Sequence, residues 1–190
     1  ENNIKESTIF PIRCAGSTMF ANKPYWCWDK HGKVKTMEQA IETSCNIASA
    51  FLGFSIGINS LIEYATRFGF NKDLDIGFYD SIRNIKISIP VAKSIFPTEV
   101  KDKYELAMVA SGLTPAKNNQ YMITPLQAAI LAQIIANNGA YVNPHIIKEI
   151  RNINGKLLYK NILVESKKVI SPSTASKIKS LMQKVVQDGI

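Results

Sequence analysis

The pattern of hydrophobic and polar positions is clearest over residues 36–54, where two helical stripes follow one another. Thr36 and Gln39 form a capping box, so a helix is predicted to begin at Met37. The first stripe has the i, i+3, i+4, i+7 spacing of a buried helix face: Met37, Ala40, Ile41 and Ser44. The second stripe follows at once: Ile47, Ala50, Phe51 and Phe54.

Two polar side chains, Ser44 and Asn46, lie between the stripes. A buried hydroxyl or amide destabilises a fold unless it is hydrogen-bonded, so these residue types are unexpected on a core-facing surface. The spacing alone leaves two interpretations open. The segment is either one long helix with small residues at a tight crossing, or two helices joined by a short polar turn that points into a site.

Two shorter helices are predicted further along the chain. Residues 60–68 are amphipathic, with Gly57 as the C-cap of the preceding helix, Asn59 as the new N-cap and Gly69 at the end. Residues 104–110 again have a helical pattern. Both helices are expected to pack one face on a core.

The strongest helix start in the sequence is the segment TPLQ at residues 124–127, which combines a capping Thr, a Pro in the first turn and a Gln to complete a capping box. Residues 128–136 are apolar on nearly every face, so this helix is predicted to be buried. Ser171-Pro172 opens a last, amphipathic helix. Its apolar positions are Ile178, Leu181, Met182 and Val185.

Strands are predicted at the N-terminus, where β-branched and aromatic residues are dense. Residues 7–14 form one predicted strand, residues 15–24 a loop, and residues 25–28 a short aromatic return strand. These two strands would pair as a hairpin.

Two more strand segments are predicted. Isoleucines alternate with polar residues over 85–89 and indicate an edge strand. Residues 146–160 indicate a hairpin, whose Asn154-Gly155 turn is predicted to be of type I′.

Composition and charge indicate one domain with no low-complexity segment or internal repeat. The chain has 190 residues, 46% hydrophobic and 20% charged, enough to bury a core. No apolar run approaches the ~18 residues of a membrane span, and residues 1–5 do not resemble a signal peptide, so the chain itself carries no targeting segment. The net charge of +8 would suit nucleic acid or a lipid surface, but the Lys and Arg residues are scattered. We therefore expect no nucleic-acid partner and favour a bias towards A/T-rich codons as the source of the charge.

The three cysteines do not have the sequence spacing of a metal site, so no metal is predicted. Cys14 and Cys27 flank the predicted N-terminal hairpin, and they are either a disulfide, if the compartment is oxidising, or two buried thiols. Cys45 is expected to be a small packing residue that such a pairing leaves free. His31 has no acid or nucleophile near it in the sequence, so we expect no catalytic role for it.

Residues around the polar triplet form a set with a specific order and spacing. They are Ala40-Ile41, Ser44-Cys45-Asn46, Phe51-Leu52-Gly53, Gly57 and Phe68-Gly69-Phe70, followed by residues 124–127, Ala136-Asn137-Asn138-Gly139 and Pro144. This set resembles the transpeptidase domain of class B penicillin-binding proteins, in which a Ser-x-Asn triplet is one of three active-site motifs beside S-x-x-K and K-T-G. The resemblance implies an α/β fold of the β-lactamase and penicillin-binding type. Residues 1–190 would be a single partial domain, mostly its helical lobe with a few antiparallel strands, and the domain continues beyond both ends in the family.

The resemblance assigns catalytic roles to Ser44 and Asn46, and it assigns no substrate-binding residue. Ser44 would relay or orient a proton between the Lys of S-x-x-K and the leaving nitrogen, and Asn46 would hold that Lys and the amide carbonyl of the substrate. The sequence departs from the family pattern because it contains no K-T-G. Its one S-x-x-K, Ser176 with Lys179, lies on the wrong side of Ser44 and is interpreted as a chance match. This chain alone is therefore expected to be inactive and not to be acylated by penicillin.

The implied function is part of a serine D,D-transpeptidase that cross-links peptidoglycan stem peptides ending in D-Ala-D-Ala and is acylated by β-lactam antibiotics. The parent protein would be membrane-anchored, lie at the outer face of the bacterial cytoplasmic membrane or in the periplasm, and work with other cell-wall synthesis proteins. No metal or nucleotide cofactor is implied. Two alternatives stay open: a serine β-lactamase or penicillin-sensing domain of the same fold, and a non-catalytic scaffold descended from it.

Overall fold

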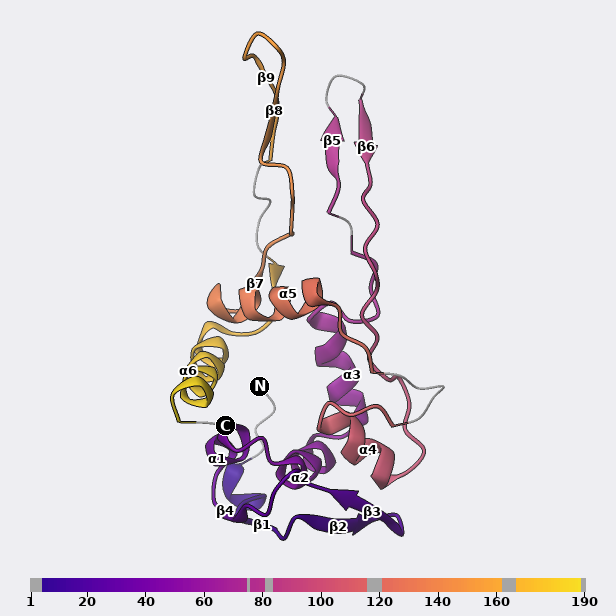
Figure 1. The fold of residues 1–190 in the computed structure, drawn as a ribbon, viewed down its shortest axis with the longest axis vertical. Coiled ribbons are helices and arrows are strands. Elements are labelled where there is room, and N and C mark those ends of the chain that lie inside the picture. Colours follow the sequence, from indigo (N-terminus) through magenta and orange to yellow (C-terminus); the bar gives the residue numbers. More distant parts are fainter. Residues whose placement is uncertain (1–4, 75, 81–83, 116–120, 162–166, 189–190) are drawn as a thin grey trace.

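Residues 5–74, 76–80, 84–115, 121–161 and 167–188 are described by the structure, which is a computed structural model. The helices in these ranges are η1 (Glu6–Thr8, a 3-10 turn), α1 (Met37–Glu42), α2 (Asn46–Ile56), α3 (Ile58–Arg67), α4 (Lys103–Ala110), α5 (Pro125–Ala136) and α6 (Pro172–Asp188). The strands are β1 (Ile12–Cys14), β2 (Ser17–Phe20), β3 (Lys23–Trp26), β4 (Gly32–Val34), β5 (Phe78–Asp80), β6 (Ile85–Ile87), β7 (Ala140–Tyr141), β8 (Glu149–Arg151), β9 (Leu157–Lys160) and β10 (Lys167–Lys168). They pair two by two and antiparallel: β1 with β4, β2 with β3, β5 with β6, β7 with β10 and β8 with β9. This mixture of helices with small antiparallel sheets is the architecture that the resemblance implied (Figure 1).

The N-terminal strands pair differently from the prediction. Of the predicted strand over residues 7–14, only Ile12–Cys14 forms, and its partner is β4, with Cys14 opposite Gly32. The predicted loop over residues 15–24 contains β2, which forms its own hairpin with β3. The expected single hairpin joining the two outer segments is therefore wrong. Runs of three or four residues are too short for their alternation to specify a partner.

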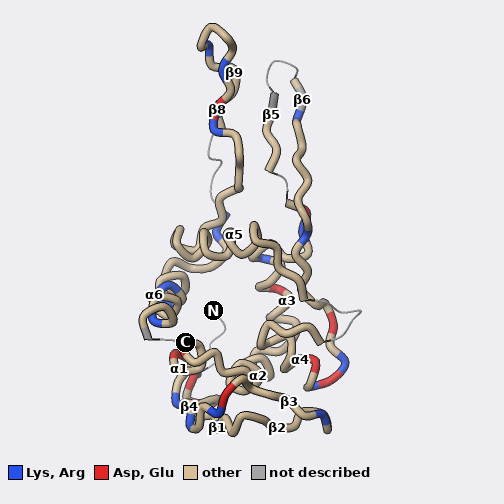
Figure 2. Tube along the Cα trace, in the orientation of Figure 1, with Lys and Arg blue, Asp and Glu red and all other residues tan. Residues whose placement is uncertain are grey.

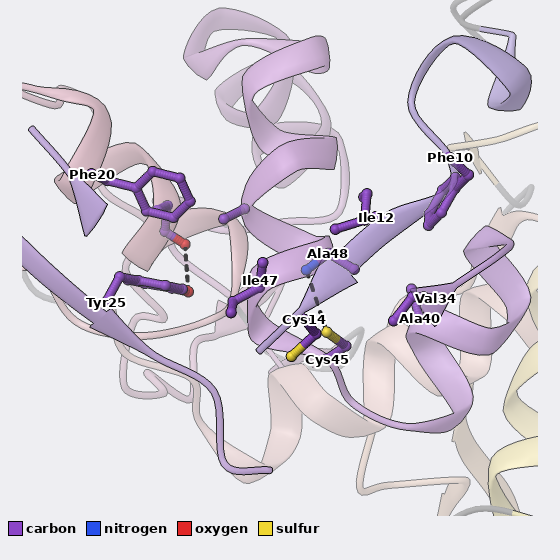
Figure 3. Close-up of a cluster of buried hydrophobic side chains, with 12 residues drawn as sticks. Phe10, Ile12, Cys14, Phe20, Tyr25, Val34, Ala40, Cys45, Ile47 and Ala48 are labelled. Carbon is purple, nitrogen blue, oxygen red and sulfur yellow. Dashed lines mark hydrogen bonds between the residues drawn. The ribbon is translucent and has the colours of Figure 1, made fainter. Parts of the chain in front are cut away.

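A buried cluster lies between these strands, α2 and α4, and Figure 3 shows it from close by. Its members are Phe10, Ile12, Cys14, Phe20, Tyr25, Val34, Ala40, Cys45, Ile47, Ala48, Ala50 and Ala107. The crossing of α2 and α4 is close because Gly53 lies against Ala110, where an added side chain would clash with the Ala110 Cβ. This packing holds α2, and with it the segment that precedes α2, against α4.

The helices α2 and α3 share one capping residue. Gly57, with a φ of 78°, ends α2 and begins α3, so the predicted N-cap Asn59 instead lies inside α3. In the described part of the chain no single helix has the length and apolar character needed to span a membrane. The two helices α2 and α3 have that length and apolar character only when taken together, and they are bent by 97° relative to each other.

The start of α5 follows the prediction, but the burial of the helix does not. Thr124 accepts a hydrogen bond from the Gln127 N–H, as a cap should. The Gln127 side chain does not complete the box; it is buried and donates from Nε2 to the Phe68 carbonyl oxygen at 2.7 Å. Ile130 and Ile134 are buried, whereas the alanines on the other face are exposed. The prediction that α5 is buried on all sides is therefore wrong for the described residues.

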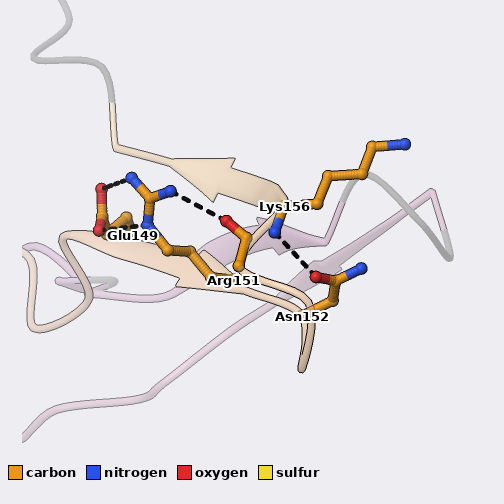
Figure 4. A network of polar contacts seen from close by, with 5 residues as sticks. Glu149, Arg151, Asn152 and Lys156 are labelled. Carbon is orange, nitrogen blue, oxygen red and sulfur yellow. Dashed lines mark hydrogen bonds and ion pairs between the residues drawn. The ribbon is translucent and has the colours of Figure 1, made fainter.

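Two hairpins, β5–β6 and β8–β9, extend away from the helices (Figure 1). The β8–β9 hairpin was predicted, but its turn is not of type I′, because Gly155 has a positive φ (78°) and Asn154 does not. Instead, the Gly155 N–H donates to the Asn152 carbonyl oxygen, and Asn152 Oδ1 accepts from the Lys156 N–H at 2.8 Å (Figure 4). The β6 strand was also predicted, and its partner β5 was not.

Lys and Arg residues occur along the helices, loops and hairpins of the described chain and do not gather on one element (Figure 2). This distribution agrees with the scatter noted in the sequence.

Candidate functional site

The polar triplet forms a tight turn between α1 and α2, so the prediction of two helices joined by a short turn is confirmed and the single long helix is wrong. Ser44 has a φ of 46°, in the left-handed region that would break any helix. Its N–H donates to the Ile41 carbonyl oxygen at 3.0 Å, and the Cys45 N–H donates to the Ala40 carbonyl oxygen at 2.9 Å. These bonds close the last turn of α1 and leave Asn46 as the first residue of α2.

Caps on both helices hold the turn in place. Thr36 Oγ1 accepts from the Gln39 N–H at 3.1 Å, and Gln39 Oε1 accepts from the Lys35 N–H at 2.8 Å. Cys45 is the N-cap of α2, and its Sγ accepts a hydrogen bond from the Ala48 N–H at 3.5 Å. The predicted start of α1 at Met37 is therefore confirmed, and a thiol takes the capping position that Ser, Thr or Asp usually occupies.

The two predicted catalytic side chains are both accessible. Ser44 is exposed, and its hydroxyl makes no side-chain hydrogen bond within the described part of the chain. Asn46 is half-buried, and its Nδ2 donates to the Trp26 carbonyl oxygen at 3.4 Å, longer than the about 2.7–3.2 Å of a strong bond. Neither residue is the buried polar group that the stripe spacing suggested, so neither needs an internal partner.

Trp28 supports the turn from outside. Its indole Nε1 donates to the Thr43 carbonyl oxygen at 3.0 Å and lies 3.2 Å from the Ser44 carbonyl oxygen. The aromatic segment that contains Trp28 was predicted only as a short return strand. The pattern gave no sign that the indole would instead bind the backbone of the Ser-x-Asn turn.

A buried hydroxyl pair supports the start of α2 from inside. Tyr25 Oη and Ser111 Oγ are 2.5 Å apart, and Ser111 Oγ donates to the Asn46 carbonyl oxygen at 3.1 Å. Tyr25 Oη also lies 3.2 Å from the Ala107 carbonyl oxygen of α4. Burial raises the pKa of Tyr25 to about 12, so this phenol is neutral at any physiological pH. Sequence reasoning missed both residues, which are far from the turn along the chain.

The cysteines lie closer to the turn than expected. All three are free thiols in this structure, which therefore has the second of the two alternatives left open for Cys14 and Cys27, unpaired thiols in place of a disulfide. Cys45, which was expected to lie apart, has its Sγ 4.0 Å from that of Cys27, and Figure 3 shows Cys14 and Cys45 side by side at the start of α2. Cys45 is fully buried, as expected for a packing residue.

The isolated S-x-x-K match lies on α6, where Ser176 and Lys179 are both exposed. Ser176 Oγ makes no hydrogen bond within the described ranges, so no base activates it there. The structure thus gives this pair no catalytic geometry.

Comparison with known proteins places the chain in a family. The sequence model described as "Penicillin binding protein transpeptidase domain" matches residues 8–190. Stage V sporulation protein D of Bacillus subtilis is 27% identical over 165 residues, which cover 86% of this chain and 23% of that protein. The peptidoglycan D,D-transpeptidase PbpA of Mycolicibacterium smegmatis is 24% identical over 151 residues, 80% of this chain and 28% of that protein. The chain therefore spans about a quarter of the length of these relatives.

Solved structures share the fold. The D,D-transpeptidase domain of a peptidoglycan glycosyltransferase from Eggerthella lenta superposes with a TM-score of 0.74 at 24% identity, covering 97% of this chain and 45% of that one. Penicillin-binding protein A of Mycobacterium tuberculosis, in its penicillin G acyl-enzyme complex, gives 0.77 at 22% identity, covering 99% and 41%. The family match extends over almost the whole sequence and the fold agrees with it, so the chain belongs to the penicillin-binding protein transpeptidase domain family.

Proposed function

We propose that this chain is part of a serine D,D-transpeptidase that cross-links peptidoglycan stem peptides and is acylated by β-lactams. The family membership supports this function, as do the names of two similar proteins: one is a peptidoglycan D,D-transpeptidase, and the other has been solved as a penicillin G acyl-enzyme. The observation that carries the proposal is the Ser-Cys-Asn turn. It presents an exposed hydroxyl and an accessible amide at a break between two helices that are capped and packed.

The two side chains have the chemistry that acyl transfer needs beside a nucleophile. A hydroxyl both donates and accepts, so Ser44 can pass a proton from a neighbouring lysine to the departing D-Ala nitrogen as the acyl bond forms on the nucleophilic serine. An amide also does both, so Asn46 can bind that lysine through its oxygen and a substrate carbonyl through its nitrogen. The long Asn46–Trp26 bond is easily exchanged for such a partner.

The contacts around the Ser-Cys-Asn turn support a catalytic role for it, because they hold its backbone in place. Two caps, the indole of Trp28 and the Tyr25–Ser111 pair hold its backbone from three sides. Catalytic groups need to be held in their productive geometry before the substrate arrives. The rigid backbone around Ser44 and Asn46 satisfies that need.

The wider setting belongs to the same proposal. Cross-linking of stem peptides takes place at the outer face of the bacterial cytoplasmic membrane, so the parent protein would be anchored there and act with other cell-wall synthesis proteins. Its partners would be the D-Ala-D-Ala end of the stem peptide and β-lactam antibiotics.

The test is acylation of the complete enzyme by a fluorescent penicillin. Proton-transfer groups contribute about 10²–10⁴ in rate, so Ser44→Ala and Asn46→Ala should each slow acylation by at least about tenfold. Ser55→Ala and Asn59→Ala are matched controls, because both side chains are exposed nearby on α2 and α3. They should acylate at the wild-type rate. Wild-type rates in both Ser44→Ala and Asn46→Ala would remove the assignment.

A second measurement uses the 190-residue chain alone. It contains the turn but no K-T-G, and its S-x-x-K serine has no hydrogen-bonded base within the described ranges. Intact-mass analysis after incubation with penicillin G should therefore show no adduct. A stoichiometric adduct on Ser44 or Ser176 would show that the chain is a compact enzyme of its own.

A further inference from the structure

Four side chains with metal-binding atoms meet directly beside the Ser-Cys-Asn turn. They are Cys14, Cys27, His31 and Cys45, and their ligand atoms all lie within 4.8 Å of one another. Cys14 ends β1, Cys27 and His31 belong to the loop between β3 and β4, and Cys45 caps α2. The fold thus brings together residues whose sequence spacing does not suggest a metal site.

Three of the distances between the ligand atoms are close to the edges of a tetrahedron around zinc. Zn–S bonds of about 2.3 Å and Zn–N bonds of about 2.0–2.1 Å place two sulfurs about 3.8 Å apart, and a sulfur and a nitrogen about 3.6 Å apart. In the structure Cys27 Sγ and Cys45 Sγ are 4.0 Å apart. His31 Nδ1 is 3.5 Å from Cys14 Sγ and 3.5 Å from Cys27 Sγ. Three of the edges are therefore already close to those of a zinc site.

Ordinary packing explains the cysteines but not the histidine. Cys14 and Cys45 are fully buried, as small apolar residues often are. His31, however, has a buried Nε2 with no hydrogen-bond partner among the described residues, and its Nδ1 faces only weak thiol donors. A polar ring in such surroundings is costly. Ligation of a cation by Nδ1 would give that nitrogen a strong partner in place of two weak thiols and would fix the ring proton on Nε2.

The surroundings of the sulfurs also favour a cation. Cys14, Cys27 and Cys45 place three sulfurs within 4.8 Å of one another, and a cation between them would offset the mutual repulsion of their thiolates. The Ala48 N–H, in the first turn of α2, already donates to Cys45 Sγ. Such donors stabilise metal-bound thiolates, and the positive end of the helix favours the net negative charge of a three-thiolate zinc centre.

We propose that Cys14, Cys27, His31 and Cys45 bind one zinc ion in a closed, structural site. Three sulfurs and one nitrogen are a ligand set that zinc takes in structural centres, and they fill all four tetrahedral positions. Binding releases the three thiol protons to solvent and forms three Zn–S bonds and one Zn–N bond. Because Cys45 lies between Ser44 and Asn46, the ion would tie the turn to β1 and to the β3–β4 loop. The sequence spacing of the cysteines predicts no metal, and this proposal revises that prediction.

The test measures zinc in the purified protein, prepared without a histidine tag and with its thiols reduced. Mass spectrometry of the metal content should give about one zinc per chain, and X-ray absorption should show about three sulfurs and one nitrogen around it. His145 is the matched control, because it is the second of two histidines and is exposed. His31→Ala should bind zinc more than about 100-fold more weakly, beyond the usual cost of losing an outer-shell partner, and His145→Ala should bind it like the wild type.

Two further measurements keep the result independent of folding defects and of catalysis. Removal of zinc from the wild-type protein by a chelator should lower its melting temperature, and zinc alone should restore it. Cys27→Ser, at a half-buried position, should remain folded by circular dichroism and lose the zinc. Reduced wild-type protein that retains no zinc, or equal zinc affinity in His31→Ala and the wild type, would overturn the proposal. Neither readout depends on acylation, so failure here leaves the transpeptidase assignment untouched, and the reverse also holds.

Discussion

The helices α2 and α5 are similar in sequence character and differ in their surroundings. Both are short and rich in alanine and large aliphatic residues. The face of α2 that contains Ile47, Ala48 and Ala50 is buried against the N-terminal strands, and Gly53 fits against α4. Only one face of α5 is buried, and alanines line its exposed face. The neighbours of a helix, and not its apolar content, therefore decide how much of it is covered.

The region around α2 and the region around α5 and α6 also differ in how completely their apolar side chains are buried. Around α2 one cluster of buried residues joins four strands, the three helices α1, α2 and α4, and the Ser-Cys-Asn turn. Around α5 and α6 the buried cluster is smaller, and apolar side chains such as Val186, at 87% exposure, face outward. The candidate site thus lies in the part of the described chain with the larger buried cluster. Substitutions of buried side chains there should lower the stability of the fold the most.

The largest effect on the free energy of unfolding is expected from a matched pair of substitutions, one alanine in α2 and one in α5. Ala50→Asp would place an unpaired carboxylate in a fully buried position and should lower the free energy of unfolding by about 3–5 kcal/mol. Ala129→Asp, on the exposed face of α5, should change it by less than about 0.5 kcal/mol. Urea denaturation of both variants measures the difference. Equal losses would show that the exposed face of α5 is covered in solution.

A smaller effect is expected from the buried phenol of Tyr25. Its pKa is raised by burial to about 12 in the folded chain, against an ordinary 10.0. The neutral phenol is therefore favoured by folding, so its contribution is present below pH 10 and is lost as the pH rises from 10 to 12. Tyr25→Phe should cost about 0.5–1.5 kcal/mol near neutral pH and flatten that alkaline loss. Thermal unfolding measured from pH 8 to pH 12 tests both statements, and an unchanged alkaline slope in the variant would contradict them.

The smallest effect on stability is expected from the ion pairs that join α6 to α1. Lys184 of α6 forms ion pairs with Glu38 and Glu42 of α1, and the side chains are partly exposed. Exposed pairs contribute about 0–1 kcal/mol, so Lys184→Ala should reduce stability by no more than that, and the loss should shrink at high salt. Lys177→Ala, at an exposed position of the same helix, is the control. A loss of several kcal/mol confined to Lys184→Ala would show that α1 depends on α6 for its place.

Local signals in the sequence determined where α1 and α5 begin. Thr36 and Thr124 cap α1 and α5 as predicted, because a capping hydrogen bond joins atoms only three residues apart. The Ser-x-Asn triplet was also identified, since its family setting is a matter of order and spacing along the chain. Short-range hydrogen bonds and backbone preferences act within a few residues, and a sequence displays them directly.

Contacts between distant segments were decided only by the tertiary structure. The partner of β1, the exposed face of α5 and the support of Asn46 by Ser111 all depend on which surfaces meet after the chain has folded. The cluster of Cys14, Cys27, His31 and Cys45 is the clearest case. No regular spacing links these residues, and they converge because β1, the β3–β4 loop and α2 share one buried core. Packing depends on complementary shape and on the burial of apolar surface. Both are properties of the assembled elements, so no single position in the sequence displays them.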